Sequence, residues 1–328
     1  MNTKAFGWLL KREYWENRGG FWTAPLVTVA IFLGLNALGL VTAEVFRGKL
    51  EANGAHIQIG VPISELTKNL GDKELHMVGE GLNMAMASYS MIIQVVLFFV
   101  LFFYLLGALY DERKDRSVLF WKSLPISDTA TVLSKVTSAL LVAPLLAFAI
   151  TALAQLALLG MLGLYALAHG INPVRFVWGP ADPMVLWAHQ LAAIPVQIIW
   201  ALPAVGWLLL CSSWARTKPF LWAVLVPVAF GVFNAFFSLW GLFNVPSQWY
   251  WSNVAGRLLL SLTPMSWLSQ DGIIDQISRI QSEQDLDVLY SLHGHLQILG
   301  SLNTWIGAAI GCLMIAAAIY LRRWRDES

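Results

Sequence analysis

Six long apolar runs constrain the fold of this chain more than any other feature of its sequence. Lipid offers no hydrogen-bond partner to a backbone, so a crossing segment must be a helix of roughly 20 residues to span about 30 Å. The runs that reach this length, with no Asp, Glu, Lys or Arg inside them, are 21–43, 89–109, 136–164, 185–211, 220–243 and 304–321. The sequence therefore predicts an all-α polytopic membrane protein with six transmembrane helices, folded as one transmembrane domain over 1–328.

Composition and charge agree with a membrane location and predict an orientation. Hydrophobic residues make up 57% of the chain and charged residues only 12%, which is typical of a membrane protein. Lys and Arg near span ends are retained on the cytoplasmic side. If the N-terminus is inside, 14 of the 21 Lys and Arg residues fall on inner segments and 7 on outer ones. We therefore expect both termini in the cytoplasm, and the net charge of +1 gives no reason to expect a nucleic-acid partner.

Residues 1–20 form a charged segment before the first apolar run, and its cations and tryptophans both recur at seven-residue spacing. Such a helix suits the membrane interface, where Trp lies at headgroup depth and cations approach lipid phosphates. We expect an N-terminal amphipathic interface helix that contacts membrane lipid. It serves either to anchor the first span or to contact a cytoplasmic partner. The candidate residues for that contact are Lys11, Arg12, Glu13, Trp15 and Arg18.

Residues 110–135 connect the second and third runs, and we call this segment the inner connection. It carries a dense charged island followed by an amphipathic stretch, which is more than a turn requires, and this indicates a docking surface for a partner. Apolar side chains would enter a groove of the partner, while neighbouring charges would form ion pairs that fix the register. The alternative is a juxtamembrane helix on lipid headgroups. The candidate residues are Asp111, Glu112, Arg113, Lys114, Asp115, Arg116, Phe120, Trp121, Leu124, Pro125 and Ile126.

Two longer segments lie on the predicted outer side. Residues 44–88 contain glycines and a proline but also helix-forming patches, so we expect an external loop that forms a small, partly helical cap. Residues 244–303 contain an apolar run, 258–262, that is too short to span the membrane. We expect this second segment to form short re-entrant or external helices before the last span.

The sequence offers little chemistry for a catalytic site. The one Gly-Lys step, at 48–49, lacks the upstream glycines of a phosphate-binding loop. Two cysteines are too few for a disulfide framework, and His293-Gly294-His295 has no carboxylate or Cys at a metal-ligand spacing. We therefore expect no catalytic residue, no metal and no cofactor bound by this chain. The polar residues inside the runs are expected to form interhelical hydrogen bonds; they are Asn36, Gln94, Gln155, His189, Gln190, Gln197 and Asn234.

Two charged segments carry a family likeness. Lys11-Arg12-Glu13-Tyr14-Trp15-Glu16-Asn17-Arg18 precedes the six spans, and the inner connection reads Asp111-Glu112-Arg113-Lys114-Asp115-Arg116-Ser117 and then Leu124-Pro125-Ile126-Ser127. With this topology, the chain resembles the permease subunits of type-2 ATP-binding cassette (ABC) transporters, which are mostly exporters. The likeness in topology covers almost the whole chain, whereas the distinctive residues are confined to these two segments.

The resemblance implies a dimer of permease chains, homodimer or heterodimer, with two copies of a separate ATPase subunit that hold ATP and Mg²⁺. It also implies that Glu112 to Ile126 forms a cytoplasmic coupling helix, that the N-terminal helix touches the ATPase, and that the protein lies in the bacterial inner membrane. Spans near the dimer axis would line the translocation path, although aromatic stripes more often serve packing. The candidate lining residues are Gln94, Phe98, Phe102, Phe233, Asn234 and Phe237.

The resulting hypothesis is the membrane-spanning subunit of an ATP-driven exporter of a hydrophobic or amphipathic substrate, which is not itself an enzyme. One alternative is an integral-membrane enzyme, for which His169, His189 or the outer Asp271 and Asp275 would have to act. Another is a membrane scaffold or sensor that uses the inner connection only to recruit a partner. The sequence does not identify the substrate, the kind of dimer, or whether the task is export or extraction of a membrane component.

Overall fold

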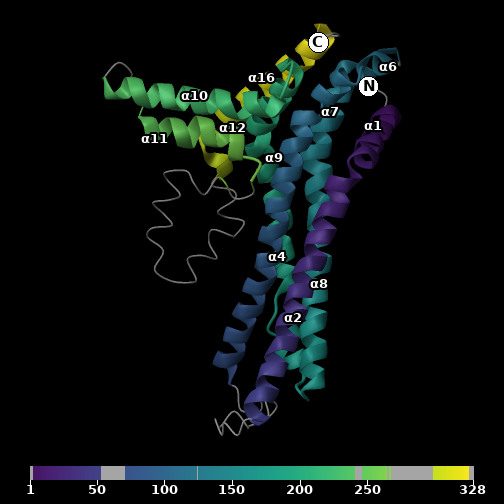
Figure 1. The fold of residues 1–328 in the computed structure, drawn as a ribbon, viewed down its shortest axis with the longest axis vertical. Helices are drawn as coiled ribbons and strands as arrows, with labels where there is room; N and C mark the ends of the chain where they lie inside the picture. Colours follow the sequence, from purple (N-terminus) through teal and green to yellow (C-terminus); the bar gives the residue numbers. More distant parts are fainter. Residues whose placement is uncertain are drawn as a thin grey trace. The chain divides into compact units, whose positions relative to one another are not determined.

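The computed structural model describes residues 3–52, 71–123, 125–240, 246–263, 266 and 298–324. Within these ranges every regular element is an α-helix or a short π-helix (Figure 1). Six helical stretches are long and apolar enough to cross a membrane, which confirms the prediction of an all-α polytopic membrane protein. They cover Gly19–Phe46, Asp72–Lys114, Asp128–Ala168, Val174–Trp214, Pro219–Ser238 and Leu302–Trp324.

Long α-helices alternate with short helices along the chain. The α-helices are α1 (Thr3–Glu16), α2 (Ala24–Ala52), α4 (Asp72–Gly107), α5 (Tyr110–Lys114), α6 (Ser117–Ser123), α7 (Asp128–Thr137), α8 (Ala143–Ala168), α9 (Pro183–Trp214), α10 (Pro219–Leu239), α11 (Ser247–Tyr250), α12 (Gly256–Leu260) and α16 (Leu302–Trp324). The π-helices are η1 (Gly19–Thr23), η2 (Ser138–Val142), η3 (Val174–Trp178) and η4 (Trp251–Ala255).

Several spans run well past the apolar cores from which they were predicted. Helix α2 continues to Ala52 and α4 already begins at Asp72, so helix covers most of the described part of the predicted external segment 44–88. The acidic residues Asp72 and Glu74 occupy the first turn of α4, where negative charge favours the helix N-terminus. At 36 residues α4 is about 54 Å long, longer than the hydrocarbon thickness of about 30 Å. The cap expected within 53–70 lies outside the described residues.

The contacts divide the chain into two compact units. Unit 1 comprises Met1–Phe21, Val95–Leu145 and Leu191–Ser328, and unit 2 comprises Trp22–Gln94 and Leu146–Gln190. In unit 1, α10 packs against α11 and α12, the short helices before the last span (Figure 1). Whether these short helices re-enter the membrane stays a prediction, and much of 244–303 lies outside the described residues.

Close backbone packing within unit 1 joins α9 to α16. A Cβ atom on Gly311 would overlap the carbonyl group of Leu202, and one on Gly206 would overlap the carbonyl oxygen of Gly311. Small residues at such crossings let helices approach closely in lipid, where apolar burial gives little drive for association. The glycines therefore hold the two helices in contact.

A neutral hydrogen-bond network joins three helices within unit 2. The Gln155 side chain on α8 donates to the carbonyl of Met86 and to Ser90 Oγ on α4, each at 3.0 Å. From α9, Trp187 donates to Gln155 Oε1 at 2.7 Å and Gln190 donates to Ser90 Oγ at 2.7 Å. The predicted interhelical role of Gln155 and Gln190 is confirmed.

Candidate functional site

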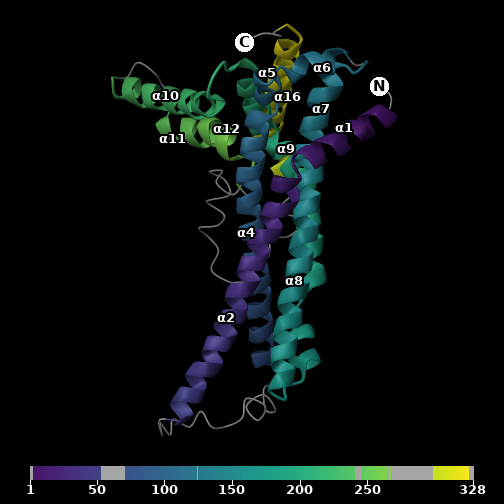
Figure 2. The same cartoon turned by 45° about the vertical axis from the view of Figure 1, so that its right-hand side comes forward.

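Six charged side chains gather at one end of unit 1, and we call them the ionic cluster. They come from four helices, α1, α5, α7 and α16 (Figure 2). Three are cations and three are carboxylates, so their formal charges cancel. The members are Arg12, Glu13, Glu112, Asp128, Lys135 and Arg322.

Glu13 is the most deeply buried member, with none of its surface exposed. The ammonium group of Lys135 lies 3.0 Å from Glu13 Oε1, and the hydroxyl of Tyr104 donates to Oε2 at 2.9 Å. Arg12 also donates to Oε1. Burying an unpaired carboxylate would cost several kcal/mol, so these partners are what make the position tolerable. Glu13 thereby fixes α1 against α7 and against Tyr104 of α4.

Glu112 is the centre of the cluster and ties the inner connection to the rest of unit 1. Its Oε1 lies 3.0 Å from Lys135 Nζ and 3.5 Å from Arg12 Nη2, while its Oε2 pairs with Arg322 Nη1. Arg322 Nε lies 3.1 Å from Asp128 Oδ1. Through Glu112, α5 is therefore linked to Arg12 of α1, Lys135 of α7 and Arg322 of α16.

Arg12 extends the contacts of the cluster to α6. Its guanidinium carbon lies 4.1 Å from the ring centroid of Trp121, a cation–π distance. Burial pulls the pKa of Arg12 down, but Glu13, and then Glu16 and Glu112, outweigh that effect and the pKa is raised. Arg12 therefore remains a cation and holds α1 against α6.

A second set of contacts fixes α5 against the end of α9. Arg113 is buried and donates to the carbonyls of Ser212 at 2.7 Å and Ala215 at 2.9 Å. The Ser212 hydroxyl accepts hydrogen bonds from the backbone N–H groups of Leu109 and Tyr110, at 2.9 and 3.0 Å. A cation at the C-terminal carbonyls of a helix is electrostatically favourable.

These contacts change the expected role of several candidate residues. Glu112 and Arg113 were expected to pair with a partner, yet the structure engages both within the chain. Glu13 was a candidate contact residue of the N-terminal helix, and its side chain is fully buried within the chain. The physical reason is that each finds an opposite charge or a carbonyl group on a distant element, which sequence spacing does not reveal.

The remaining candidates keep an accessible face. The side chain of Phe120 is 60% exposed, and its neighbour Leu119 is 54% exposed. Trp121 and Ile126 are half-buried, and Leu124 lies outside the described residues. The other exposed candidates are Asp111, Lys114, Asp115, Arg116 and Pro125 on the inner connection, and Lys11, Trp15 and Arg18 on α1.

The candidate lining residues form small aromatic groups. Phe98 and Phe102 on α4 lie 5.8 Å apart between ring centroids, and Phe102 also contacts Phe220 at 6.2 Å. On α10, Phe233 and Phe237 lie 4.3 Å apart. Gln94 and Asn234 are half-buried. Their assignment to a translocation path stays a prediction.

Sequence reasoning missed three members of the ionic cluster. Arg322, Asp128 and Lys135 were not among the candidate residues named from the sequence. A weak signal existed, because Asp128 and Lys135 are seven residues apart and so share one helix face. Only the fold shows which distant partners face them.

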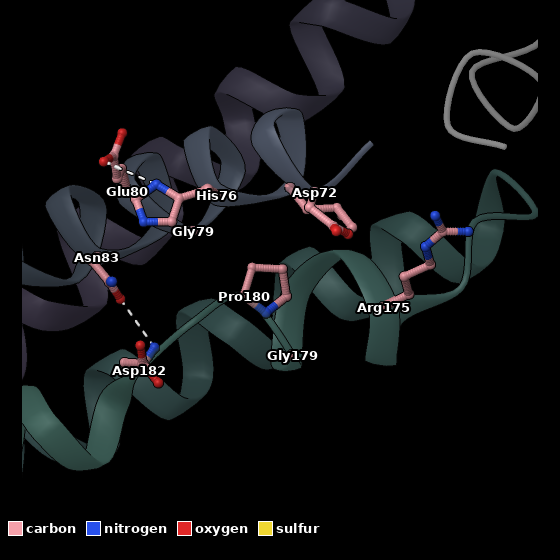
Figure 3. Close-up of a pocket in the computed structure, with 10 residues that line it drawn as sticks. Asp72, His76, Gly79, Glu80, Asn83, Arg175, Gly179, Pro180 and Asp182 are labelled. Atoms are coloured by element: carbon pink, nitrogen blue, oxygen red, sulfur yellow. Dashed lines mark hydrogen bonds and ion pairs between the residues drawn. The ribbon is translucent and has the colours of Figure 1, made fainter. Parts of the chain in front are cut away.

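Unit 2 contains a cavity of about 360 Å³, lined by both charged and apolar residues, between the first turns of α4 and the η3–α9 connection (Figure 3). His76 pairs with Glu80 at 3.1 Å, and Asn83 accepts a hydrogen bond from the Asp182 backbone at 3.1 Å. A Cβ atom on Gly79 would lie 2.6 Å from the carbonyl oxygen of Pro180, so glycine permits the close approach there. The cavity holds both signs of charge, because Asp72, Glu80 and Asp182 line it together with Arg175.

His169, named for the enzyme alternative, makes contacts within unit 2. Its Nε2 lies 2.8 Å from Glu44 Oε1, and its Nδ1 lies 2.8 Å from the carbonyl oxygen of Tyr165. His189 is half-buried on α9, and Asp271 and Asp275 lie outside the described residues. Among the described residues, no three His, Cys, Asp or Glu side chains are grouped so that they could hold a metal ion.

Comparison of the chain with protein-family models, with curated proteins and with solved structures found no match.

Proposed function

We propose that this chain is the membrane-spanning subunit of an ATP-driven ABC exporter of the type-2 class. It would lie in the bacterial inner membrane with both termini in the cytoplasm, pair with a second permease chain, and bind two ATPase subunits that carry ATP and Mg²⁺. The observation that carries the proposal is the ionic cluster, because it joins α5, which carries Glu112, to α1, α7 and α16 of unit 1.

The proposed coupling acts through rigid contacts. A partner that moves the inner connection moves Glu112, and with it Lys135 of α7 and Arg322 of α16. Arg113 transmits the same displacement to the end of α9. Transport follows if the ATPase binds two arrangements of these helices with different affinity in its two nucleotide states.

The energetics of the cluster also favour a mechanical role. Buried ion pairs add little net stability compared with apolar packing, but they impose geometry, since a misplaced charge is expensive. A plain turn between two spans would need none of them. The exposed Phe120 and Leu119 lie beside Lys114, Asp115 and Arg116, so a partner could bury apolar area and set register on the same surface.

The candidate lining residues support one part of the proposal, the class of substrate. The candidate lining residues are aromatic or neutral, and the apolar runs hold no Asp, Glu, Lys or Arg. Such a path suits a hydrophobic or amphipathic substrate rather than a small ion.

The test is co-purification with the ATPase encoded beside it, followed by ATP hydrolysis in nanodiscs. We predict that Phe120→Ala lowers chain-dependent hydrolysis by about tenfold, since an anchor side chain at an interface contributes about 1.4 kcal/mol or more. Phe46→Ala is the matched control, because Phe46 is 65% exposed but lies on α2, near its predicted outer end.

Three outcomes would contradict the proposal. The first is that no nucleotide-hydrolysing partner exists, and the second is that Phe120→Ala leaves hydrolysis unchanged. The third is that a Lys114→Cys variant is labelled from the extracytoplasmic side. An ATPase that binds the chain yet hydrolyses ATP at the same rate without it would favour the scaffold alternative.

A further inference from the structure

Arg257 on α12 is a buried cation with incomplete compensation. Only 8% of its surface is exposed, and no described residue places a carboxylate within ion-pair distance of it. Its guanidinium carbon lies 4.2 Å from the ring centroid of Trp200, and its Nη1 donates to the carbonyl of Asn303. Its Nε and Nη2 atoms are buried without a hydrogen-bond partner among the described residues.

The two unpartnered nitrogens form one edge of the guanidinium. Nε–H and Nη2–H point the same way, with the spacing that matches two oxygens of a carboxylate or phosphate. Nη1, which already donates to the Asn303 carbonyl, is not part of this edge. The free edge is therefore a bidentate donor that is already oriented by the Asn303 carbonyl and the Trp200 ring.

Helix α16 leaves room for this side chain. A Cβ atom on Gly307 would overlap the guanidinium carbon and both terminal nitrogens of Arg257. Any larger residue at 307 would displace the cation, so the niche depends on a glycine facing it.

Two further polar atoms in the same corner lack a partner within the described part of the chain. They are Gln197 Oε1 and Ser261 Oγ, each buried. Gln197 is one helical turn from Trp200, Ser261 is one turn from Arg257, and Gln197 Nε2 donates to the carbonyl of Ser261 at 2.9 Å. Buried polar atoms are nearly always satisfied, so several orphans together indicate a missing group.

Arg322 in the ionic cluster shows how this chain treats another buried arginine. It is 5% exposed and pairs with two carboxylates, Glu112 and Asp128. Desolvation lowers the pKa of Arg257, with no opposing influence from an acidic neighbour among the described residues. The described helices supply no countercharge for Arg257, and its free edge has the geometry to take one from a bound anion.

We infer that Arg257, with the Ser261 hydroxyl, binds the phosphate or carboxylate head of an anionic amphiphile. The tail would be received by exposed apolar side chains close in sequence to the niche: Leu260, three residues after Arg257, is 54% exposed, and Leu302, next to Asn303, is 73% exposed. The Arg257 fork takes two oxygens of the head, and the Ser261 hydroxyl donates to a third. The site does not depend on the proposed exporter function, because binding is measured on the chain alone.

The test uses the full chain in nanodiscs of phosphatidylcholine with or without phosphatidylglycerol, and native mass spectrometry to count retained lipid. The wild type should retain phosphatidylglycerol preferentially, and Arg257→Gln should lose that preference by at least about tenfold. Arg175→Gln is the matched control, because Arg175 is an exposed arginine on the same predicted side of the membrane. Equal retention in Arg257→Gln and the wild type would overturn the site.

A stability measurement separates binding from a purely structural role. In phosphatidylcholine alone, Arg257→Gln should unfold at the same temperature as the wild type or a higher one, because an uncompensated charge is gone. With phosphatidylglycerol present the order should reverse. A variant that is less stable in both lipids would show that Arg257 merely holds Asn303 and Trp200, which overturns the site.

Two further arms define the ligand and the niche. Gly307→Ala retains the cation but displaces it, and should lose the lipid preference as Arg257→Gln does; retention there would overturn the niche. Inorganic phosphate added in detergent should not shift the unfolding temperature. A shift as large as that given by phosphatidylglycerol would assign the site to a free anion and overturn its assignment to an amphiphile.

Discussion

The ionic cluster of unit 1 and the neutral network of unit 2 solve the same problem with different chemistry. Both cross-link several helices, and both contain a side chain with no exposed surface, Glu13 in the cluster and Gln155 in the network. The cluster uses six formal charges, whereas the network uses an amide pair, a hydroxyl, an indole and a backbone carbonyl.

The positions of these residues in the sequence explain why one region uses charged side chains and the other uses neutral ones. Every member of the ionic cluster lies outside the six apolar runs, and every side chain of the neutral network lies inside one. A charged side chain near the membrane surface can be solvated by water and lipid headgroups, whereas one deep in the hydrocarbon cannot. A buried neutral group that loses its hydrogen-bond partner costs less free energy than a buried charge that loses its partner. Charged contacts therefore join the helices outside the apolar runs, and neutral contacts join them within the runs.

The largest expected effect is on the cluster. Lys135→Met leaves both Glu13 and Glu112 without their cation at 3.0 Å, so we predict a loss of about 3–5 kcal/mol in the free energy of unfolding. Denaturant unfolding in mixed micelles measures it.

The control for this prediction is the double variant Glu13→Gln/Lys135→Met, which removes a carboxylate together with the cation. Its loss should be smaller than the sum of the two single losses, because contacting residues do not act additively. A loss below about 1 kcal/mol in Lys135→Met would show that the charges are solvated, and the contrast with the neutral network would fail.

A smaller effect is expected in the network. Gln155→Leu leaves the Met86 carbonyl, Ser90 and the Trp187 indole with fewer partners, and we predict a loss of about 0.6–2 kcal/mol. The same unfolding measurement applies. Ser88→Ala on α4 is the control, since Ser88 is exposed and its hydroxyl bonds to a carbonyl of its own helix. A loss as large as that of Lys135→Met would erase the distinction between the two regions.

The two regions also differ in how far the sequence predicted them. The apolar runs predict spans because crossing a membrane is a local requirement, and Gln155 and Gln190 stand out as polar residues within such runs. The ionic cluster is not local, because Glu13 and Lys135 are 122 positions apart and Glu112 and Arg322 are 210 apart. The sequence shows which residues of 110–135 are charged, but it does not show which distant residues they pair with.

The ends of the spans escaped prediction for a related reason. A helix need not end where the hydrocarbon ends, so α2 and α4 continue beyond the apolar runs into the external segment 44–88, which was expected to be only partly helical. The burial of Arg257 also could not be predicted from the sequence. It follows a run of aromatic and polar residues, and only the packing of α9 and α16 shows that it is buried.

The smallest expected effect concerns Glu16, one turn from the buried Glu13 on α1. Burial raises the pKa of Glu16, Arg12 lowers it less, and Glu13 also raises it. A carboxyl whose pKa is raised on folding contributes stability at low pH and loses it as the pH rises from its ordinary value of 4.5 through its folded-state pKa.

Glu16 is half exposed, so solvent screens the effect. Glu16→Gln should therefore change the free energy of unfolding at pH 7 by less than about 0.5 kcal/mol, toward greater stability. Unfolding measured from pH 4 to pH 7 checks it, with Glu13→Gln alongside. If the exposed and the buried glutamate gave equal losses, burial would not be what distinguishes the ionic cluster from a surface charge.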